Sequence, residues 1–320
     1  MNKSSIIIIL AFSVTVFAGG PGAEKSSPKK LANIGNTCFM NAALQCLYNM
    51  TEFTDAILAT PPNFYKPKSI AELYKNLLKE LRETNKDVIT PTEFCPRIWQ
   101  EIGQTAGSQG DVKAVVDLLF QHVLKDDLQA PAKPYYAELI EYTIKTTDIL
   151  NNGEMRSREI SSPTFVLSGN NFQASLADIT TPRNNPDGSQ RIRTFTKTGR
   201  YLVCTKAFGK TEPFPFPTKF DLAQNSYNLI SCAFHRGSSD QSGHYVAYVK
   251  KNNRWFYCSD TTIEEIPEST IVRFSRYGYE KSNLDLPPQL MEKSKSDLPI
   301  LLMYERQTPI ASTSKTLAIP

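Results

Sequence analysis

The sequence contains little of what several classes of protein need. Its six cysteines include no pair at C-x-x-C spacing, which argues against a structural zinc site. Six cysteines in 320 residues are also far too few for a disulfide scaffold. The formal net charge is only +4, with basic and acidic residues mixed, so nothing indicates a nucleic-acid partner. What remains is a chain with 40% hydrophobic residues, long enough for one large domain or two lobes.

The N-terminal segment, residues 1–18, is typical of a secretory signal peptide. A lysine precedes an apolar run over residues 6–17, and small residues precede a cleavage point near Gly19. The competing interpretation is an uncleaved membrane anchor, against which the shortness of the apolar run argues. Residues 19–29 are rich in Gly, Pro, Ser and Lys and indicate a flexible lead-in. We therefore expect a secreted protein that meets a membrane only if this segment is retained.

Residues 31–50, LANIGNTCFMNAALQCLYNM, place Cys38 where a glycine-containing loop runs into a helix. A thiol in the first turn of a helix lies near unpaired backbone N–H groups and the positive end of the helix dipole, which favour the thiolate. Cys38 is therefore the candidate nucleophile. The alternative is that it is a buried apolar residue, as free cysteines commonly are.

The first half of the chain has helical periodicity and the second half has strand-like runs. Ser69 and Glu72 form a capping box at the start of one amphipathic pattern. The polar segments 151–162 and 180–199 are predicted to be loops or hairpin tips. Predicted helices cover residues 69–85, 94–102 and 111–123. Predicted strands cover the C-terminal half of residues 135–149 and residues 164–167, 201–208, 227–234, 244–250, 255–258 and 300–304. The class is α+β, a helical lobe followed by an antiparallel sheet.

Only three histidines are available as the base for a nucleophilic cysteine. His122 lies in a predicted amphipathic helix and is most simply a structural or surface residue. His235 and His244 flank a predicted loop between two strands. His244 opens its strand directly after Gly243, where another backbone can approach closely. We favour His244, because a base must be held on a rigid element that faces the nucleophile.

Ser259 and Asp260 end the strand that follows the His244 strand. An imidazole needs a partner on its second nitrogen to fix its tautomer and orientation. Adjacent residues on a strand point to opposite faces, so only one of these two is expected to face His244. Asn33, shortly before Cys38, is the candidate donor to an oxyanion, with a simple turn role as the alternative.

Two long segments resemble the ubiquitin-specific proteases, a papain-like family of deubiquitinating cysteine peptidases. LANIGNTCFMNAALQCL is similar to the family's Cys box, and YNLISCAFHRGSSDQSGHYVAYVKKNNRWFYCSDTTI is similar to its His box. The shorter segments SQGDVKAVVDLLF, GRYLVCTKAF and LLMYERQ resemble further parts of the family. The resemblance covers residues 30–307 in fragments and indicates one catalytic domain, with residues 308–320 as a C-terminal tail.

The resemblance implies a right-hand architecture, with a helical thumb over residues 30–130 and a sheet-built palm and fingers over residues 131–307. The active site would lie between thumb and palm, where the C-terminal residues of ubiquitin reach the thiolate. It implies that Cys38 is the nucleophile, His244 the general base and acid, and Asn33 the oxyanion donor.

The resemblance also implies where the substrate is held. Substrate contacts are expected at four residues, and residues 236–242 match a loop beside the ubiquitin tail. The four residues are Gln109, Asp111, Gly243 and Tyr245. Ala114 and Ala207 stand where relatives usually have Glu and Arg, which weakens the expectation for ubiquitin contacts more than for the chemistry.

The third catalytic position departs from the family pattern. Ser259 stands where relatives usually have an acidic or amide residue, and Asp260 follows it. We hypothesise a Cys38–His244–Ser259 triad with Asp260 assisting nearby. The C-x-x-C pairs that many relatives carry at the fingertips are absent, so the fingers should be short and metal-free, and no cofactor or metal is expected.

These observations predict a cysteine peptidase that cleaves isopeptide or peptide bonds after the C-terminal Gly of ubiquitin, with ubiquitin and its conjugates as partners. An export signal on a thiol enzyme with a eukaryotic substrate suggests an effector delivered into another cell's reducing cytosol. Three alternatives remain open: a protease for SUMO or NEDD8, a catalytically inactive ubiquitin-binding module, and a disulfide-stabilised secreted binding protein.

Overall fold

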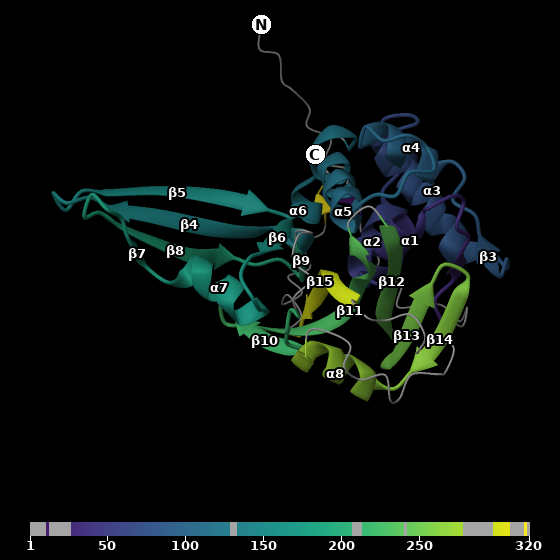
Figure 1. The fold of residues 1–320 in the computed structure, drawn as a ribbon. Helices are drawn as coiled ribbons and strands as arrows, with labels where there is room; N and C mark the ends of the chain where they lie inside the picture. Colours follow the sequence, from purple (N-terminus) through teal and green to yellow (C-terminus); the bar gives the residue numbers. More distant parts are fainter. Residues whose placement is uncertain are drawn as a thin grey trace, which may run out of the picture.

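The computed structural model describes residues 11–12, 27–128, 133–206, 213–239, 242–277, 297–307 and 317–318. A group of helices lies against one side of a large sheet, and a second sheet projects away from this body (Figure 1). Most of the predicted signal peptide and C-terminal tail lies outside the described residues. From these two segments the structure describes only β1 (Ala11–Phe12) and β16 (Leu317–Ala318), which pair antiparallel.

The helical lobe is organised around α1 (Cys38–Tyr48), which is buried along almost its whole length. It packs against α5 (Val112–Gln121) and against the sheet strand β12 (Ser242–Lys251). A short parallel pair, β2 (Lys30–Leu31) with β3 (Val88–Ile89), fixes the chain just before the Cys38 loop. The other helices of this lobe are α2 (Thr51–Ala59), η1 (Pro62–Phe64), α3 (Ile70–Glu83), α4 (Phe94–Glu101), α5 (Val112–Gln121) and the π-helical turn η2 (His122–Asp126).

Two helix starts follow from capping side chains, as the sequence predicts. The Ser69 side chain accepts a hydrogen bond from the Glu72 N–H at the start of α3, 3.2 Å away. Asp111 caps α5 by accepting from the Lys113 N–H at 2.9 Å. The placement of His122 within this α-helix was wrong, because α5 ends one residue earlier and a π-helical turn follows.

The palm is an eight-stranded sheet whose main path runs β14-β13-β12-β11-β15-β9-β6, with β10 paired to β11. All its pairings are antiparallel except β6 with β9. Its strands are β6 (Thr164–Leu167), β9 (Tyr201–Lys206), β10 (Lys219–Leu222), β11 (Asn225–Ser239), β12 (Ser242–Lys251), β13 (Arg254–Ser259), β14 (Thr262–Ile266) and β15 (Asp297–Arg306). The α+β class with an antiparallel palm is therefore confirmed. No helix in the described part of the chain is long and apolar enough to cross a membrane.

The fingers form a separate four-stranded sheet in the order β5-β4-β8-β7, which contains no cysteine. Residues 151–162 and 180–199 were predicted to be loops or hairpin tips; each contains a hairpin turn, but most of their residues form strands of this sheet. Its strands are β4 (Tyr142–Ile149), β5 (Met155–Ser162), β7 (Arg183–Asn184) and β8 (Gln190–Lys197). The prediction failed because β5 is exposed almost throughout, so it carries no apolar alternation that would indicate a strand. The helices α6 (Lys133–Ile140), α7 (Phe172–Thr180) and α8 (Glu268–Tyr277) flank the two sheets.

The β11–β12 hairpin also differs from expectation, because residues 236–242 were predicted to form a loop. The two strands stay paired from Arg236 opposite His244 to Ser239 opposite Ser242, with one irregularity between these pairs. Both faces of the sheet are buried. Tyr245 belongs to the core under the helical lobe, and Val246 belongs to the core on the opposite face. The hairpin is thus a rigid two-sided element that carries His244 to the edge of the helical lobe.

Candidate active site

The loop before α1 is folded around the side chain of Asn33. Asn33 Oδ1 accepts hydrogen bonds from the N–H groups of Gly35 and Thr37, both at 3.1 Å. Gly35 has φ +108°, a conformation that favours glycine. On the outer side of the loop, Asn36 Nδ2 donates to Gly107 O at 2.8 Å. This arrangement delivers Cys38 as the first residue of α1, as the sequence predicts.

The protonation of Cys38 differs from the expectation of a stabilised thiolate. The side chain is only 4% exposed, and burial raises the pKa of the Cys38 thiol. The N–H of Tyr245 hydrogen-bonds the sulfur and lowers this pKa, the charge of Asp260 raises it, and the N–H groups at the start of α1 lower it. Desolvation outweighs the helix terminus, so in this state the neutral thiol is favoured.

The packing of α1 against β12 brings the Cys38 end of the helix near the base. Tyr245 follows His244 in β12, and its N–H lies near enough to Cys38 to lower the pKa of the thiol. The ring of Tyr245 packs edge-on against Phe39 of α1, with ring centroids 6.4 Å apart. The structure therefore brings together Cys38 and the His244 region, which are distant in the sequence.

His244 and Ser259 are in direct contact. His244 Nε2 and Ser259 Oγ lie 2.7 Å apart, a short hydrogen bond that fixes the imidazole. Ser259 is the last residue of β13, the strand paired with β12. The expectation that only one of the two consecutive residues would face His244 agrees with this geometry, and the residue is Ser259.

Asp260 turns away from the imidazole toward the Cys38 loop. It has φ +51°, in the left-handed region that is uncommon for a residue other than glycine. Asp260 Oδ2 accepts from Asn33 Nδ2 at 2.9 Å, and Oδ1 accepts from Asn41 Nδ2 at 2.8 Å. Its carbonyl oxygen accepts from the Leu31 N–H at 3.1 Å. Asp260 thus connects the end of β13 to the loop and to α1.

The predicted substrate-binding residues fall into two groups. Gln109 Nε2 donates to Gly243 O at 3.2 Å, which joins the loop before α5 to the start of β12. Gly243 has φ +152°, and an added Cβ would lie 2.4 Å from Arg236 O, so only glycine fits. Asp111 is engaged as the cap of α5, and burial raises its pKa. Gln109 and Gly243 therefore lie next to His244, whereas Asp111 has a structural hydrogen bond of its own.

Asn41 is a residue of this site that the sequence analysis did not identify. It is 2% exposed and lies one turn after Cys38 in α1. Its Nδ2 donates to Ala32 O at 3.2 Å as well as to Asp260. A polar residue in the middle of an apolar helix was the available signal, but the periodicity alone does not say which atoms it meets.

No group of three or more potential ligands that could hold a metal ion occurs among the described residues. All six cysteines lie in the described part of the chain, and all are free and buried. These free thiols contradict the disulfide-stabilised alternative.

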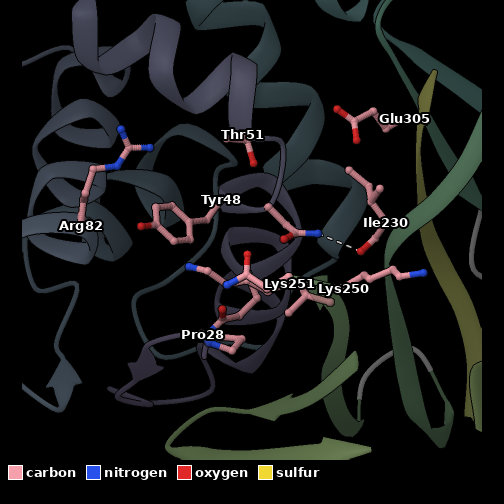
Figure 2. A pocket seen from close by; sticks show the side chains of 12 residues that line it. Pro28, Tyr48, Thr51, Arg82, Ile230, Lys250, Lys251 and Glu305 are labelled. Atoms are coloured by element: carbon pink, nitrogen blue, oxygen red, sulfur yellow. Dashed lines mark hydrogen bonds between the residues drawn. The ribbon is translucent and has the colours of Figure 1, made fainter. Parts of the chain in front are cut away.

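A separate pocket of about 130 Å³ lies at the other end of α1, and Figure 2 shows it from close by. Asn49 Nδ2 donates to Ile230 O at 2.8 Å across this pocket, the bond drawn as a dashed line. The lining residues are Pro28, Gln45, Tyr48, Asn49, Thr51, Arg82, Ile230, Val249, Lys250, Lys251, Asn252 and Glu305. None of the predicted site residues lines it, so it is distinct from the Cys38 site.

A family model described as ubiquitin carboxyl-terminal hydrolase matches residues 29–304. Ubiquitin carboxyl-terminal hydrolase 26 of Arabidopsis thaliana is 23% identical over 287 residues, which cover 76% of this chain and 26% of the relative. Its namesake from Oryza sativa subsp. japonica is 24% identical over 286 residues, with 75% and 26% covered. Ubiquitin carboxyl-terminal hydrolase 15 of Rattus norvegicus is 31% identical over 126 residues, with 36% and 13% covered.

The chain thus spans about a quarter of the length of these two relatives, since the match covers 26% of each. The family match extends from the lead-in before Cys38 to the last strand of the palm, and it includes every residue of the candidate site. The resemblance seen in the Cys box and the His box is confirmed. The chain belongs to the ubiquitin carboxyl-terminal hydrolase family.

Proposed function

We propose that the protein is a thiol-dependent deubiquitinase, which hydrolyses isopeptide or peptide bonds after the C-terminal Gly of ubiquitin. The observation that carries this proposal is the pairing of His244 Nε2 with Ser259 Oγ beside a cysteine at a helix start. Because Ser259 holds Nε2, Nδ1 is the nitrogen that takes the proton of the Cys38 thiol. Nucleophile, base and orienting group are thus the three parts that cysteine catalysis requires.

In the proposed reaction the Cys38 sulfur attacks the carbonyl carbon of the terminal Gly, and His244 accepts the thiol proton. The carbonyl oxygen becomes an oxyanion, which accepts from the backbone N–H of Cys38 and from an N–H of Asn33. One Nδ2 hydrogen of Asn33 is directed to Asp260, and the other is the donor for the oxyanion. His244 then protonates the leaving amine, and water, deprotonated by His244, hydrolyses the thioester. One oxyanion donor is typically worth about 2.7–4 kcal/mol.

Two features of the substrate-free site have to change when ubiquitin binds: the protonation of Cys38 and the hydrogen bond between Gln109 and Gly243. Burial and the charge of Asp260 keep Cys38 protonated in the described state. Gln109 bridges to Gly243 beside His244, where the tail of ubiquitin is proposed to pass. The tail therefore has to replace this bridge, and the carbonyl of Gly243 then accepts from a main-chain N–H of the substrate.

The direct test compares fluorogenic substrates made from ubiquitin, SUMO and NEDD8, using the wild type and Cys38→Ala. We expect hydrolysis of the ubiquitin substrate by the wild type only, and covalent labelling of Cys38 by a ubiquitin carrying a C-terminal electrophile. Faster hydrolysis of the SUMO or NEDD8 substrate than of the ubiquitin substrate would show that the protein acts on that modifier instead of ubiquitin. Ubiquitin binding without labelling would indicate a catalytically inactive binding module.

We further propose that residues 1–18 direct export and that the enzyme works in a reducing compartment of another cell. The apolar run at residues 6–17 supports the first statement, and the six free thiols support the second. Expression of the full chain followed by N-terminal sequencing of the secreted product tests the export. A mature N-terminus near Gly19 is expected, and a product that keeps residues 1–18 in the membrane fraction contradicts it.

A further inference from the structure

Asn41 is a polar residue inside α1, a helix that is buried along almost its whole length. Its side chain is 2% exposed, and its neighbours Met40 and Ala42 are core residues. Nδ2 makes two hydrogen bonds, to Asp260 Oδ1 at 2.8 Å and to Ala32 O at 3.2 Å. Oδ1 has no hydrogen-bond partner in the described part of the protein.

The unpaired acceptor shows which half of this amide is needed. A buried polar atom without a hydrogen bond costs about 1–3 kcal/mol, so an asparagine is a poor choice for packing alone. An apolar side chain of similar volume would remove that cost but would also remove both donors. Residues that break a local rule in this way are expected at functional sites. Asn41 therefore contributes through its N–H groups, and the stronger of their two bonds goes to Asp260.

Asp260 divides its two carboxylate oxygens between two amides. Oδ1 receives Asn41 at 2.8 Å and Oδ2 receives Asn33 at 2.9 Å. The residue also has φ +51°, so its backbone is held in an uncommon conformation while its carbonyl accepts from Leu31. Because the carboxylate is planar, a hydrogen bond that holds Oδ1 also fixes the direction of Oδ2 toward Asn33. Without Asn41, the carboxylate could rotate about its terminal torsion, which is broad for Asp.

We propose that Asn41 is a positioning residue for the oxyanion donor: it holds Asp260 Oδ1 so that Oδ2 holds the Asn33 amide toward the reacting carbonyl. This inference rests on the deubiquitinase function proposed above. The chain of contacts runs from α1 through the end of β13 to the loop before Cys38, and each contact is a hydrogen bond of 2.8 to 2.9 Å.

An oxyanion donor stabilises the transition state, and this determines which kinetic constants should change in the Asn41 variants. The charge on the carbonyl oxygen exists in the transition state and not in the bound substrate, so misaligning the donor lowers kcat and leaves KM nearly unchanged. Removing one oxyanion donor outright costs about 100- to 1000-fold in kcat, so misaligning it should cost less, about 10- to 100-fold. A residue that only stabilises the fold would instead lower the melting temperature and leave kcat of the folded fraction unchanged.

The experiment is a double-mutant cycle on ubiquitin hydrolysis with Asn41→Leu, Asp260→Ala and the double variant. Asn41→Leu should lower kcat about 10- to 100-fold with KM within about twofold. In the Asp260→Ala background the same change should have almost no further effect, because its route to Asn33 is already absent. An equal loss in both backgrounds overturns the proposal, as does a wild-type kcat in the single variant.

Gln45→Leu is the matched control, on the same helix one turn further along. Gln45 is a buried amide whose Nε2 donates to Lys29 O at 2.6 Å, separate from the contacts of Asp260 with Asn33 and Asn41. It should lower stability without lowering kcat. If Asn41→Leu does not fold, Asn41→Ser and Asn41→Ala form a second pair of equal bulk, of which only Ser keeps a donor. A higher kcat for Ser than for Ala supports the proposal, and equal values overturn it.

The two proposals fail in different ways. A wild type that hydrolyses no ubiquitin substrate overturns the proposed function. An active wild type whose kcat is insensitive to Asn41→Leu, with binding and folding intact, overturns only the role of Asn41.

Discussion

At the scale of single residues, the partner of His244 is a hydroxyl instead of a carboxylate. Ser259 Oγ lies 2.7 Å from His244 Nε2, close enough to fix the tautomer and the ring orientation. A hydroxyl does this without a charge, so it stabilises the imidazolium less than a carboxylate would. The carboxylate of the next residue serves the oxyanion side of the site instead.

Ser259→Ala should lower kcat, because the imidazole loses its orienting hydrogen bond. A hydrogen bond to a group that becomes charged is worth about 1.5–3 kcal/mol, which corresponds to roughly 10- to 150-fold in kcat. Steady-state hydrolysis of a ubiquitin substrate measures this, and Ser259→Asp is the rescue variant expected to recover activity. Full activity of Ser259→Ala beside an inactive Asp260→Ala would assign the orienting role to Asp260.

The chemistry at this scale could be predicted from the sequence, and the protonation and the supporting contacts could not. Cys38 and His244 followed from a loop–helix junction and a glycine-preceded strand, and strand alternation predicted that Ser259 and Asp260 diverge. The raised pKa of Cys38 depends on burial, which the sequence does not give. Asn41 was missed because helical periodicity does not identify a partner that is 219 residues away.

At the scale of elements, a buried lysine joins the end of α2 to α3. Lys75 is 4% exposed, its Nζ donates to Thr60 O just after α2, and it lies 5.0 Å from the centroid of the Tyr65 ring. Burial, and to a smaller degree the charge of Lys79, lower the pKa of Lys75 to about 8. The folded state therefore disfavours the charged form that the unfolded chain keeps up to higher pH.

The free energy of unfolding should therefore contain a contribution that increases with pH. The folded pKa of about 8 lies below the ordinary value of 10.5, so between these values the unfolded state binds more protons. The Lys75 contribution to stability rises with pH over that window and is lost below it. The buried thiols act in the opposite direction, because burial raises their pKa values above the ordinary value of 9.0, so variants that share them are compared. Urea unfolding between about pH 7.5 and pH 9.5 measures the slope, at values below the ordinary tyrosine range. The difference in the free energy of unfolding between the wild type and Lys75→Met should rise with pH, and the exposed Lys79→Met should differ much less from the wild type; a pH-independent difference for Lys75→Met contradicts the assignment.

The fingers sheet is closed at its tip by hydrogen bonds. Leu150 N donates to Glu154 O at 2.8 Å within the β4–β5 hairpin. Asn151 Nδ2, in the same turn, donates to Asp187 O in the turn between β7 and β8, so this bond joins the two hairpins. We expect that a metal chelator leaves the melting temperature and ubiquitin hydrolysis unchanged, because the tip has protein donors and acceptors in place. Thermal denaturation with and without the chelator measures this, and a fall in melting temperature restored by zinc would contradict it.

The strands β5 and β12 show which strands a sequence pattern can predict and which it cannot. Polar, exposed β5 is defined by its pairing with β4 and not by its own side chains. In β12, by contrast, both faces are buried, and the apolar run YVAYV indicates the strand directly. Sequence patterns report burial, so most of the buried palm and the partly buried β4 of the fingers could be predicted, whereas β5, β7 and β8 could not.

At the scale of the whole molecule, six thiols are buried in a protein for which we propose export. We expect that a thiol reagent finds six reactive cysteines in denaturant without prior reduction, in agreement with the free state of all six. A reductant should leave the melting temperature unchanged. Recovery of fewer thiols until a reductant is added would show disulfides in the isolated protein and contradict the structure.

The Asp260 contacts also set when during folding the enzyme becomes active. Asn33 and Asp260 are 227 residues apart in the chain, and contacts of such long range form only after a large loop-closure entropy has been overcome. A chain whose N-terminal and C-terminal halves have not yet packed together has its cysteine and its histidine but no aligned oxyanion donor. We therefore expect the proposed activity to appear only after the two halves have packed together.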